Sequence, residues 1–189
     1  MVVLKNSKNS YGLLTIIIHW LSALLIYLLF ALGIYMADLD YMSPYYQTAP
    51  EAHMGVGFLV LLMFIFRLGW HLYSKLPDSL PMPSWQELIS KIVHKSFYVI
   101  IVLVCISGYL IPTAKGESLS VFGLFEIPAT LTGAVYGSLN QEDFYGKVHW
   151  YLAIFVVVLS MVHAGAAFKH HFIDKDSTLK RMLGFDDKK

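Results

Sequence analysis

Long stretches without charge are the feature that most limits what this chain can fold into. Four stretches contain no Lys, Arg, Asp or Glu: residues 9–37, 52–66, 96–114 and 148–168. About 18 or more apolar residues in a row are enough for a helix that crosses a membrane. Only 14% of the 189 residues are charged and the net charge is +1. A soluble enzyme, a disordered chain and a nucleic-acid-binding protein are therefore excluded as classes.

The apolar stretches predict an all-α integral membrane four-helix bundle, forming one domain over residues 1–189. Backbone groups in lipid must be satisfied within their own segment, so each stretch is expected to be helical. The apolar residues are continuous rather than alternating, which argues against a membrane β-barrel. The first helix is expected to remain as a span and not to be a cleaved signal peptide. The expected helices cover residues 12–37, 51–74, 90–112 and 146–172.

The positions of lysine and arginine predict how the chain crosses the membrane. The two terminal segments and the 75–91 loop carry lysine or arginine, whereas the 38–51 segment carries none. Positive residues are retained on the cytoplasmic side. We therefore expect both termini and the 75–91 loop inside, and the 38–51 and 113–145 segments outside.

Histidine is the second unusual feature, because this weakly charged chain contains eight of them. Ionisable residues within membrane spans are costly and usually serve a function. His149 and His163 lie 14 residues apart, a spacing that returns to within about 40° of one helix face and rises about 21 Å. His19 is expected at the depth of His163, near the inner side. His53 is expected at the depth of His149, near the outer side.

Two depth-matched histidine pairs predict two stacked haems in the core of the bundle. Haem iron takes two axial ligands across a flat ring, so the ligands come from facing helices at one level. The pairs His19 with His163 and His53 with His149 meet this requirement. Zinc is less favoured because it takes four tetrahedral ligands. Ligation by histidine and methionine is also less favoured, because no methionine recurs at a matching depth.

The single cysteine, Cys105, lies inside an apolar stretch. One cysteine excludes an intramolecular disulfide, an iron–sulfur cluster and the CxxCH motif of covalently attached haem. We expect Cys105 to be a small buried apolar side chain, and the haems to be non-covalent haem b.

Arg67 follows His53 by the same 14 residues. An arginine in apolar surroundings is costly, and a haem propionate would pair with it bidentately. The alternative is that its side chain extends to the inner lipid headgroups.

The other histidines have arginine or lysine nearby in the sequence. His71 and His94 are therefore expected to be interfacial, and they are the rival ligands at the inner level. His94 is also a candidate for binding a quinone oxygen or a propionate. His170 and His171 are expected to be solvated.

The 113–145 loop contains an apolar patch at residues 121–125. Loops of this length are usually functional or disordered. The patch is expected either to lie on the membrane surface and cap the bundle, or to pack on the loop's own side chains. Lys115 and Lys147 fall near the outer pair, where they would either steer an anion or serve as ordinary interfacial lysines.

Residues spread along almost the whole chain carry a family resemblance. They are Tyr11, His19, Trp20, His53, Arg67, Leu68, His94, Tyr98, Gly108, His149, His163, Ala164 and the tail 170–182. Together they resemble the bacterial di-haem cytochrome b561 proteins, within the four-helix b-type cytochromes that include membrane subunits of hydrogenase and formate dehydrogenase. The resemblance covers residues 11–183 and implies haem ligation by the same two histidine pairs.

The resemblance also implies an oxidoreductase of the bacterial inner membrane. A member of this family oxidises superoxide at the outer face and passes the electron to ubiquinone. We therefore expect electron transfer between an outer-side donor, with superoxide favoured, and the quinone pool. Outer-sphere electron transfer needs no general base, so no catalytic acid–base residue is expected. The expected contacts are lipid, quinone, and superoxide or a periplasmic redox partner, with no nucleic acid; a homodimer is one option.

Two alternatives remain at this point. The first is an electron-transfer subunit that serves a periplasmic redox partner and has no turnover of its own. The second is a non-redox transporter that uses membrane histidines as a proton relay. The lack of a second intramembrane carboxylate and of an inverted repeat counts against that transporter.

Overall fold

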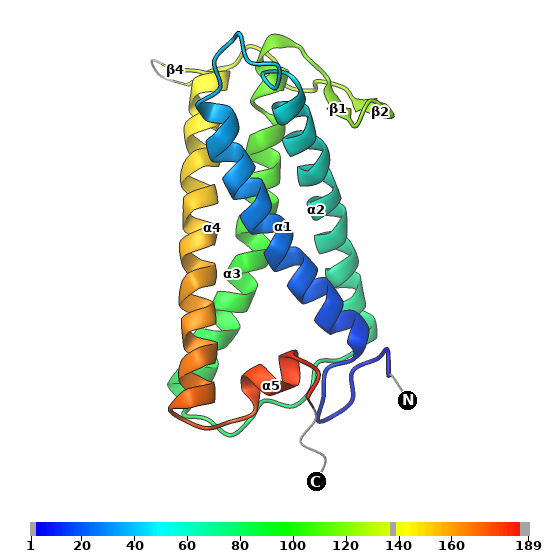
Figure 1. Ribbon diagram of the computed structural model, residues 1–189, viewed down its shortest axis with the longest axis vertical. Helices are drawn as coiled ribbons and strands as arrows, with labels where there is room; N and C mark the ends of the chain where they lie inside the picture. The colour runs from blue at the N-terminus through cyan, green and yellow to red at the C-terminus, as the bar shows by residue number, and fades with distance from the viewer. Residues whose placement is uncertain (1–2, 137–138, 186–189) are drawn as a thin grey trace. The chain divides into compact units, whose positions relative to one another are not determined.

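The computed structural model describes residues 3–136 and 139–185, and four long helices dominate it (Figure 1). Each is long and apolar enough to cross a membrane, which makes the chain a multi-pass membrane protein. The prediction of a mainly helical chain with four spans is thus confirmed. The helices are α1 (Leu13–Ala37), α2 (Thr48–Tyr73), α3 (Ser84–Tyr109) and α4 (Gln141–Phe172), followed by a short α5 (Thr178–Met182).

Three helices begin earlier than the apolar pattern predicts: α2 starts at Thr48 instead of 51, and α3 and α4 differ most, starting at Ser84 and Gln141 instead of 90 and 146. Helix α3 starts directly after Pro83, whose carbonyl accepts hydrogen bonds from the first-turn amides of Gln86 and Glu87. Helix α4 starts after Asn140, whose Oδ1 accepts a hydrogen bond from the amide of Asp143 at 2.8 Å. Proline just before a helix, a side-chain cap and acidic first-turn residues all favour a helix start. Hydropathy alone does not register these polar signals.

The chain divides into two compact units, and every long helix contributes one segment to each. Unit 1 comprises Met1–Leu24, Met63–Phe97 and Val158–Lys189. Unit 2 comprises Leu25–Leu62 and Tyr98–Val157. The histidines of one predicted pair, His19 and His163, fall in unit 1, and His53 and His149 fall in unit 2.

In unit 1, side-chain hydrogen bonds tie the N-terminal segment to α1 and α2. The Oδ1 atom of Asn6 accepts from the amide of Gly12 and from the hydroxyl of Thr15, both at 2.8 Å. Its Nδ2 donates to the carbonyl of Ser74 at 3.0 Å. The indole of Trp70 donates to Thr15 Oγ1 at 3.0 Å. The segment before α1 is therefore anchored to the end of α2.

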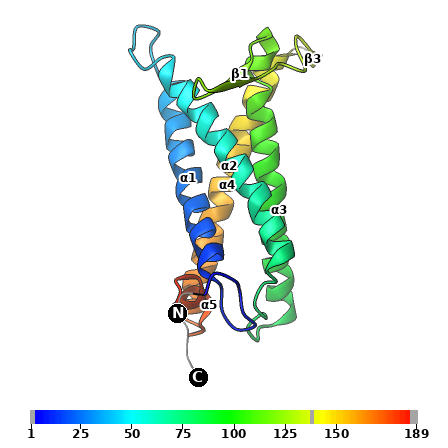
Figure 2. The same cartoon turned by 90° about the vertical axis from the view of Figure 1, so that its right-hand side faces the viewer.

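The tail of unit 1 returns to α1 through α5, which lies near the N-terminal segment (Figure 2). The indole of Trp20 donates to the carbonyl of Met182 at 2.9 Å. Arg181 is buried, donates to the carbonyl of Asp78 at 3.1 Å and lies over the ring of Tyr11. These contacts fix the tail against the same segments that Asn6 joins.

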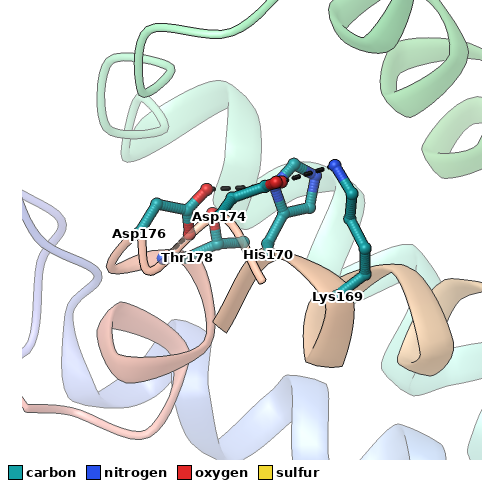
Figure 3. A network of polar contacts seen from close by, with 5 residues as sticks. All are labelled: Lys169, His170, Asp174, Asp176 and Thr178. Carbon is teal, nitrogen blue, oxygen red and sulfur yellow. Dashed lines mark hydrogen bonds and ion pairs between the residues drawn. The ribbon is translucent and has the colours of Figure 1, made fainter. Parts of the chain in front are cut away.

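An ion-pair network closes the end of α4 (Figure 3). Asp174 pairs with Lys169 at 2.6 Å and with His170 at 3.0 Å, and His170 also lies 3.0 Å from Asp176. The expectation that His170 is solvated is therefore wrong, since its side chain is only 18% exposed. His171 is also half-buried. The sequence alone does not reveal this pairing, because it depends on how the chain turns after Phe172.

In unit 2, described parts of the long 113–145 segment are held together by one buried amide. Gln141 is 1% exposed. Its Nε2 donates to the carbonyls of Leu110 and Leu131 at 3.0 and 2.8 Å, and its Oε1 accepts from the amide of Ala134 at 3.1 Å. The loop also contains a 3₁₀ turn (Pro112–Lys115) and the strands β3 (Val135–Tyr136) and β4 (Leu139–Asn140).

The apolar patch at 121–125 belongs to a hairpin, in which β1 (Leu119–Val121) pairs antiparallel with β2 (Phe125–Ile127). The hairpin turns at Phe122 and Gly123, both with positive φ. The ring of Phe122 lies directly over Gly55, and Phe125 contacts Phe58 with 5.7 Å between ring centres. The patch thus covers part of α2, and the alternative that it packs only on its own loop is wrong. Its place on the membrane surface stays a prediction.

We predict that Asp174→Asn loosens the α5 tail without affecting the long helices. The hydrogen bond from Lys169 lowers the pKa of Asp174 below its usual value. The carboxylate therefore stabilises the folded tail at neutral pH, and this stabilisation is lost as the pH falls through the lowered pKa. Hydrogen–deuterium exchange should show faster exchange over residues 177–183 at pH 7, by a small factor because the pairs are exposed. At acid pH, where the Asp174 carboxylate is protonated, the variant and the wild type should exchange at the same rate over these residues. Asp143→Asn, at the start of α4, is the control; equal exchange in all three proteins at pH 7 would contradict the prediction.

Candidate functional site

Unit 2 brings His53 of α2 and His149 of α4 together. Their ring centres lie 6.1 Å apart and the ring planes are 73° from parallel. Glycines stand behind both imidazoles: a Cβ on Gly33 would lie 3.3 Å from the ring of His53, and one on Gly108 would lie 3.0 Å from that of His149. The predicted juxtaposition of these two histidines is therefore present in the structure.

The hydrogen bonds of His149 define which nitrogen is free. Nδ1 lies 2.9 Å from the backbone carbonyl of Val104 and 3.4 Å from the hydroxyl of Ser107. A carbonyl can only accept, so Nδ1 carries the proton and Nε2 keeps its lone pair. This is the usual arrangement of a metal-binding imidazole, whose other nitrogen donates to the protein. Nδ1 of His53 is buried and makes no hydrogen bond with the described residues.

Unit 1 brings His19 of α1 and His163 of α4 together, with ring centres 6.3 Å apart and planes 60° from parallel. The second predicted pair is therefore also present. The guanidinium of Arg67 lies 3.4 Å from Nδ1 of His19 and 6.0 Å from the ring of Phe64. Arg67 is half-buried, and its side chain reaches the pair instead of leaving it.

His94 is closer to this pair than the sequence indicated. Its ring centre lies 5.1 Å from that of His163. Its Nδ1 lies 2.7 Å from the carbonyl of Ser90, one turn earlier in α3. His71 lies within electrostatic reach of Arg67 and His94. The charged neighbours in the sequence indicate an interfacial His94. They do not indicate that the face of α3 carrying His94 points toward His163.

The separation of the imidazoles provides a test of whether an iron ion fits between them. A bond from a transition metal to an imidazole nitrogen is about 2.0–2.1 Å, so two opposed rings bound to one ion have centres roughly 6 to 6.5 Å apart. The observed separations of 6.1 and 6.3 Å both fall in this range. The residues present therefore fit an ion with two axial histidines, at two places.

The donor set also indicates which kind of metal group fits. Within residues 3–136 and 139–185, neither pair belongs to a cluster of three or more His, Cys, Asp or Glu donors within 4.8 Å. Zinc takes four such ligands. Two imidazoles alone leave four positions around an octahedral ion, and a haem supplies those four from its own ring. The glycines behind the unit 2 rings are consistent with a site built for tight packing.

The predicted role of Lys115 as an anion-steering residue is weakened by its partner. Its ammonium lies 3.0 Å from Oε1 of Glu142. A lysine paired with a carboxylate presents little net positive charge at a distance. The two residues are 27 positions apart, so the pairing depends on the loop fold and not on local sequence. Lys147 is exposed on α4.

The fold and the site together define a multi-pass membrane protein with two pairs of opposed histidines inside its helical units. The family model for prokaryotic cytochrome b561 matches residues 10–185. The chain therefore belongs to the prokaryotic cytochrome b561 family, whose members are haem-containing electron carriers.

Relatives of known name cover nearly the whole chain. Cytochrome b561 homolog 2 of Escherichia coli (strain K12) is 46% identical over 182 residues, which span 95% of this chain and 94% of that protein. Cytochrome b561 homolog 1 of the same organism is 27% identical over 93% of this chain and 97% of its own length. A protein of Yersinia pestis named probable superoxide oxidase CybB is 27% identical over 93% of this chain and 96% of its own length.

The three neighbouring imidazoles of unit 1 lead to a prediction about which two of them bind iron. His163→Ala is expected to abolish one of two haem signals, because His163 is a ring neighbour of both His19 and His94 and would pair with either of them. His94→Ala is expected to retain both signals if His19 is the other ligand. Haem content and low-temperature reduced spectra of the purified variants check this. Loss of one haem in His94→Ala, with both retained in His19→Ala, would reverse the assignment.

Proposed function

We propose that this protein is a di-haem b-type cytochrome of the bacterial inner membrane that carries electrons between a donor at the outer face and the quinone pool. The observation that carries the proposal is the pair of opposed histidines in each unit, at 6.3 and 6.1 Å. Family membership supports the haem, and the positive-inside rule supports cytoplasmic termini. The outer face is then the side of the 38–51 and 113–145 segments.

In this proposal His19 and His163 are the axial ligands at the inner level, and His53 and His149 are those at the outer level. When bound, haem b supplies reversible one-electron transfer. The chain's own residues fix the ring nitrogens: Val104 holds the proton of His149 on Nδ1 and leaves Nε2 for the iron.

Arg67 is proposed to hold a propionate at the inner level. The guanidinium lies 3.4 Å from Nδ1 of His19, which is long for a hydrogen bond. A carboxylate is the group that arginine binds best, through two parallel hydrogen bonds. A propionate there would neutralise the arginine and free Nδ1 of His19 from a positive neighbour.

Superoxide is the favoured donor and ubiquinone the favoured acceptor. Each superoxide would lose one electron to become O₂. Two such electrons, with two protons from the medium, would convert one quinone to quinol. The support is the Yersinia pestis relative named probable superoxide oxidase, which is 27% identical. No acid–base residue of the chain is assigned to the oxidation, because outer-sphere electron transfer requires none.

A second candidate is an electron-transfer subunit for a periplasmic redox protein. The ion pair of Lys115 with Glu142 favours it, because the loop then lacks one of the two lysines expected to attract a small anion. The relative with 46% identity is named only as a cytochrome b561 homolog. A homodimer stays a prediction.

The haem content is the first test. Purified protein is expected to show a b-type α band in the reduced-minus-oxidised spectrum, with about two haems per chain. His149→Ala should lose the haem at the outer level and keep the other. His170→Ala is the matched control, because it also removes a half-buried histidine of α4 but one that pairs with aspartates. A His149→Ala variant with two intact haems would refute the ligand assignment.

The donor is tested by kinetics with protein that carries both haems. If superoxide is the donor, it should reduce the protein rapidly, and quinone should then reoxidise it. Lys147→Gln should slow the reduction and lower its dependence on salt, because exposed positive charge raises encounter rates with anions. Lys115→Gln should have a smaller effect, because Glu142 already offsets its charge. No reduction by superoxide would leave the periplasmic partner as the donor.

A further inference from the structure

Two glycines in unit 2 stand in the same relation to a histidine. Gly108 lies behind His149, and an added Cβ would be 3.0 Å from Cε1 and 3.1 Å from Nδ1. Gly33 lies behind His53, and an added Cβ would be 3.3 Å from Cε1. These contacts are tighter than side chains normally tolerate, so an alanine at either position would press on the imidazole.

Gly108 also follows by four residues a carbonyl that faces the same imidazole. That carbonyl belongs to Val104 and lies 2.9 Å from Nδ1 of His149. At the other position Nδ1 of His53 makes no hydrogen bond with the described residues. A glycine against an imidazole thus occurs twice, on α1 toward α2 and on α3 toward α4, and the carbonyl contact is formed on α3.

Helix geometry explains why the spacing is four. The carbonyl of residue i accepts the amide of residue i+4 and retains a second lone pair. The Cα–Cβ bond tilts toward the helix N-terminus, so the side chain of residue i+4 leans over the turn that contains this carbonyl. A glycine at i+4 leaves the carbonyl uncovered, and a side chain from a neighbouring helix can then reach it.

We propose that Gly108 is a positioning residue, which exposes the carbonyl of Val104 so that it orients His149 as an iron ligand, and that Gly33 leaves the room in which the ring of His53 is oriented as another. The proposal rests on the haem ligation proposed above. An Nδ1–H bond to a carbonyl fixes the ring orientation, directs the Nε2 lone pair at the metal and raises the basicity of the ligand. A more basic imidazole stabilises ferric iron, so this contact also lowers the reduction potential of the haem it holds.

The alternative is that these glycines serve only close helix packing, as glycines in membrane helices often do. Gly57 offers the matched control, because it lies in the same unit, on the apolar helix α2, and an added Cβ there meets nothing within 4 Å. If the glycines served only packing, an alanine in their place would not act on the imidazole in particular. A positioning role changes the spectroscopic and redox properties of the outer-level haem in particular.

The experiment compares Gly108→Ala, Gly33→Ala and Gly57→Ala with wild type, in purified protein loaded with haem. We expect Gly108→Ala to weaken haem retention at the outer level about 10- to 100-fold, as loss of the hydrogen bond that orients a metal-binding imidazole does. In the haem that remains, the midpoint potential should rise and the low-spin EPR signal should shift. Gly33→Ala should act in the same direction but less, because its contact is looser. Gly57→Ala and the inner-level haem should be unchanged.

Three results would overturn the inference. The first is an unchanged potential, EPR signal and haem retention in Gly108→Ala. The second is a change of the same size in these three properties in Gly57→Ala. The third is loss of both haems in Gly108→Ala and in Gly33→Ala, which would indicate general unfolding. A wild-type protein without two haems would instead refute the proposed function, so the two failures are distinguishable.

Discussion

The structure depends on one constraint: an imidazole placed inside an apolar helix needs a partner for each of its ring nitrogens. Water is scarce at that depth, and an unpaired polar group there costs free energy. In unit 2 the carbonyl of Val104 accepts the proton of Nδ1 of His149, which leaves Nε2 of that ring with its lone pair. In unit 1 a guanidinium and a third imidazole are the neighbours instead. The same residue type thus acquires two different electrostatic surroundings along one set of helices.

That difference is chemically meaningful for a carrier of single electrons. A carbonyl partner makes an imidazole a stronger electron donor to its metal, whereas a nearby positive charge favours the reduced, more negative state. The carbonyl of Val104 therefore lowers the reduction potential of the proposed haem held by His149. At the other level the effect of Arg67 depends on the proposed propionate, because the pair of arginine and propionate carries no net charge.

Much of this could be predicted from the sequence because apolar length and helical periodicity are local properties. The four spans follow from hydropathy, and the two histidine pairs follow from a 14-residue spacing on one helix. Other features were not predictable because they depend on tertiary placement. His94 lies near the unit 1 pair only because of the face of α3 on which it stands. Lys115 forms an ion pair with a glutamate 27 residues away. The ring of Phe122 packs on Gly55 because of a hairpin that hydropathy does not indicate.

Helix α4 has a consequence for how the protein is made. It supplies one histidine to each proposed haem, and it is the last long helix in the chain. If the proposed axial pairs are correct, neither pair can be complete until α4 has been synthesised and inserted. Loading of both haems would then come late in biogenesis, and a chain truncated before α4 would hold neither haem by the proposed axial pairs.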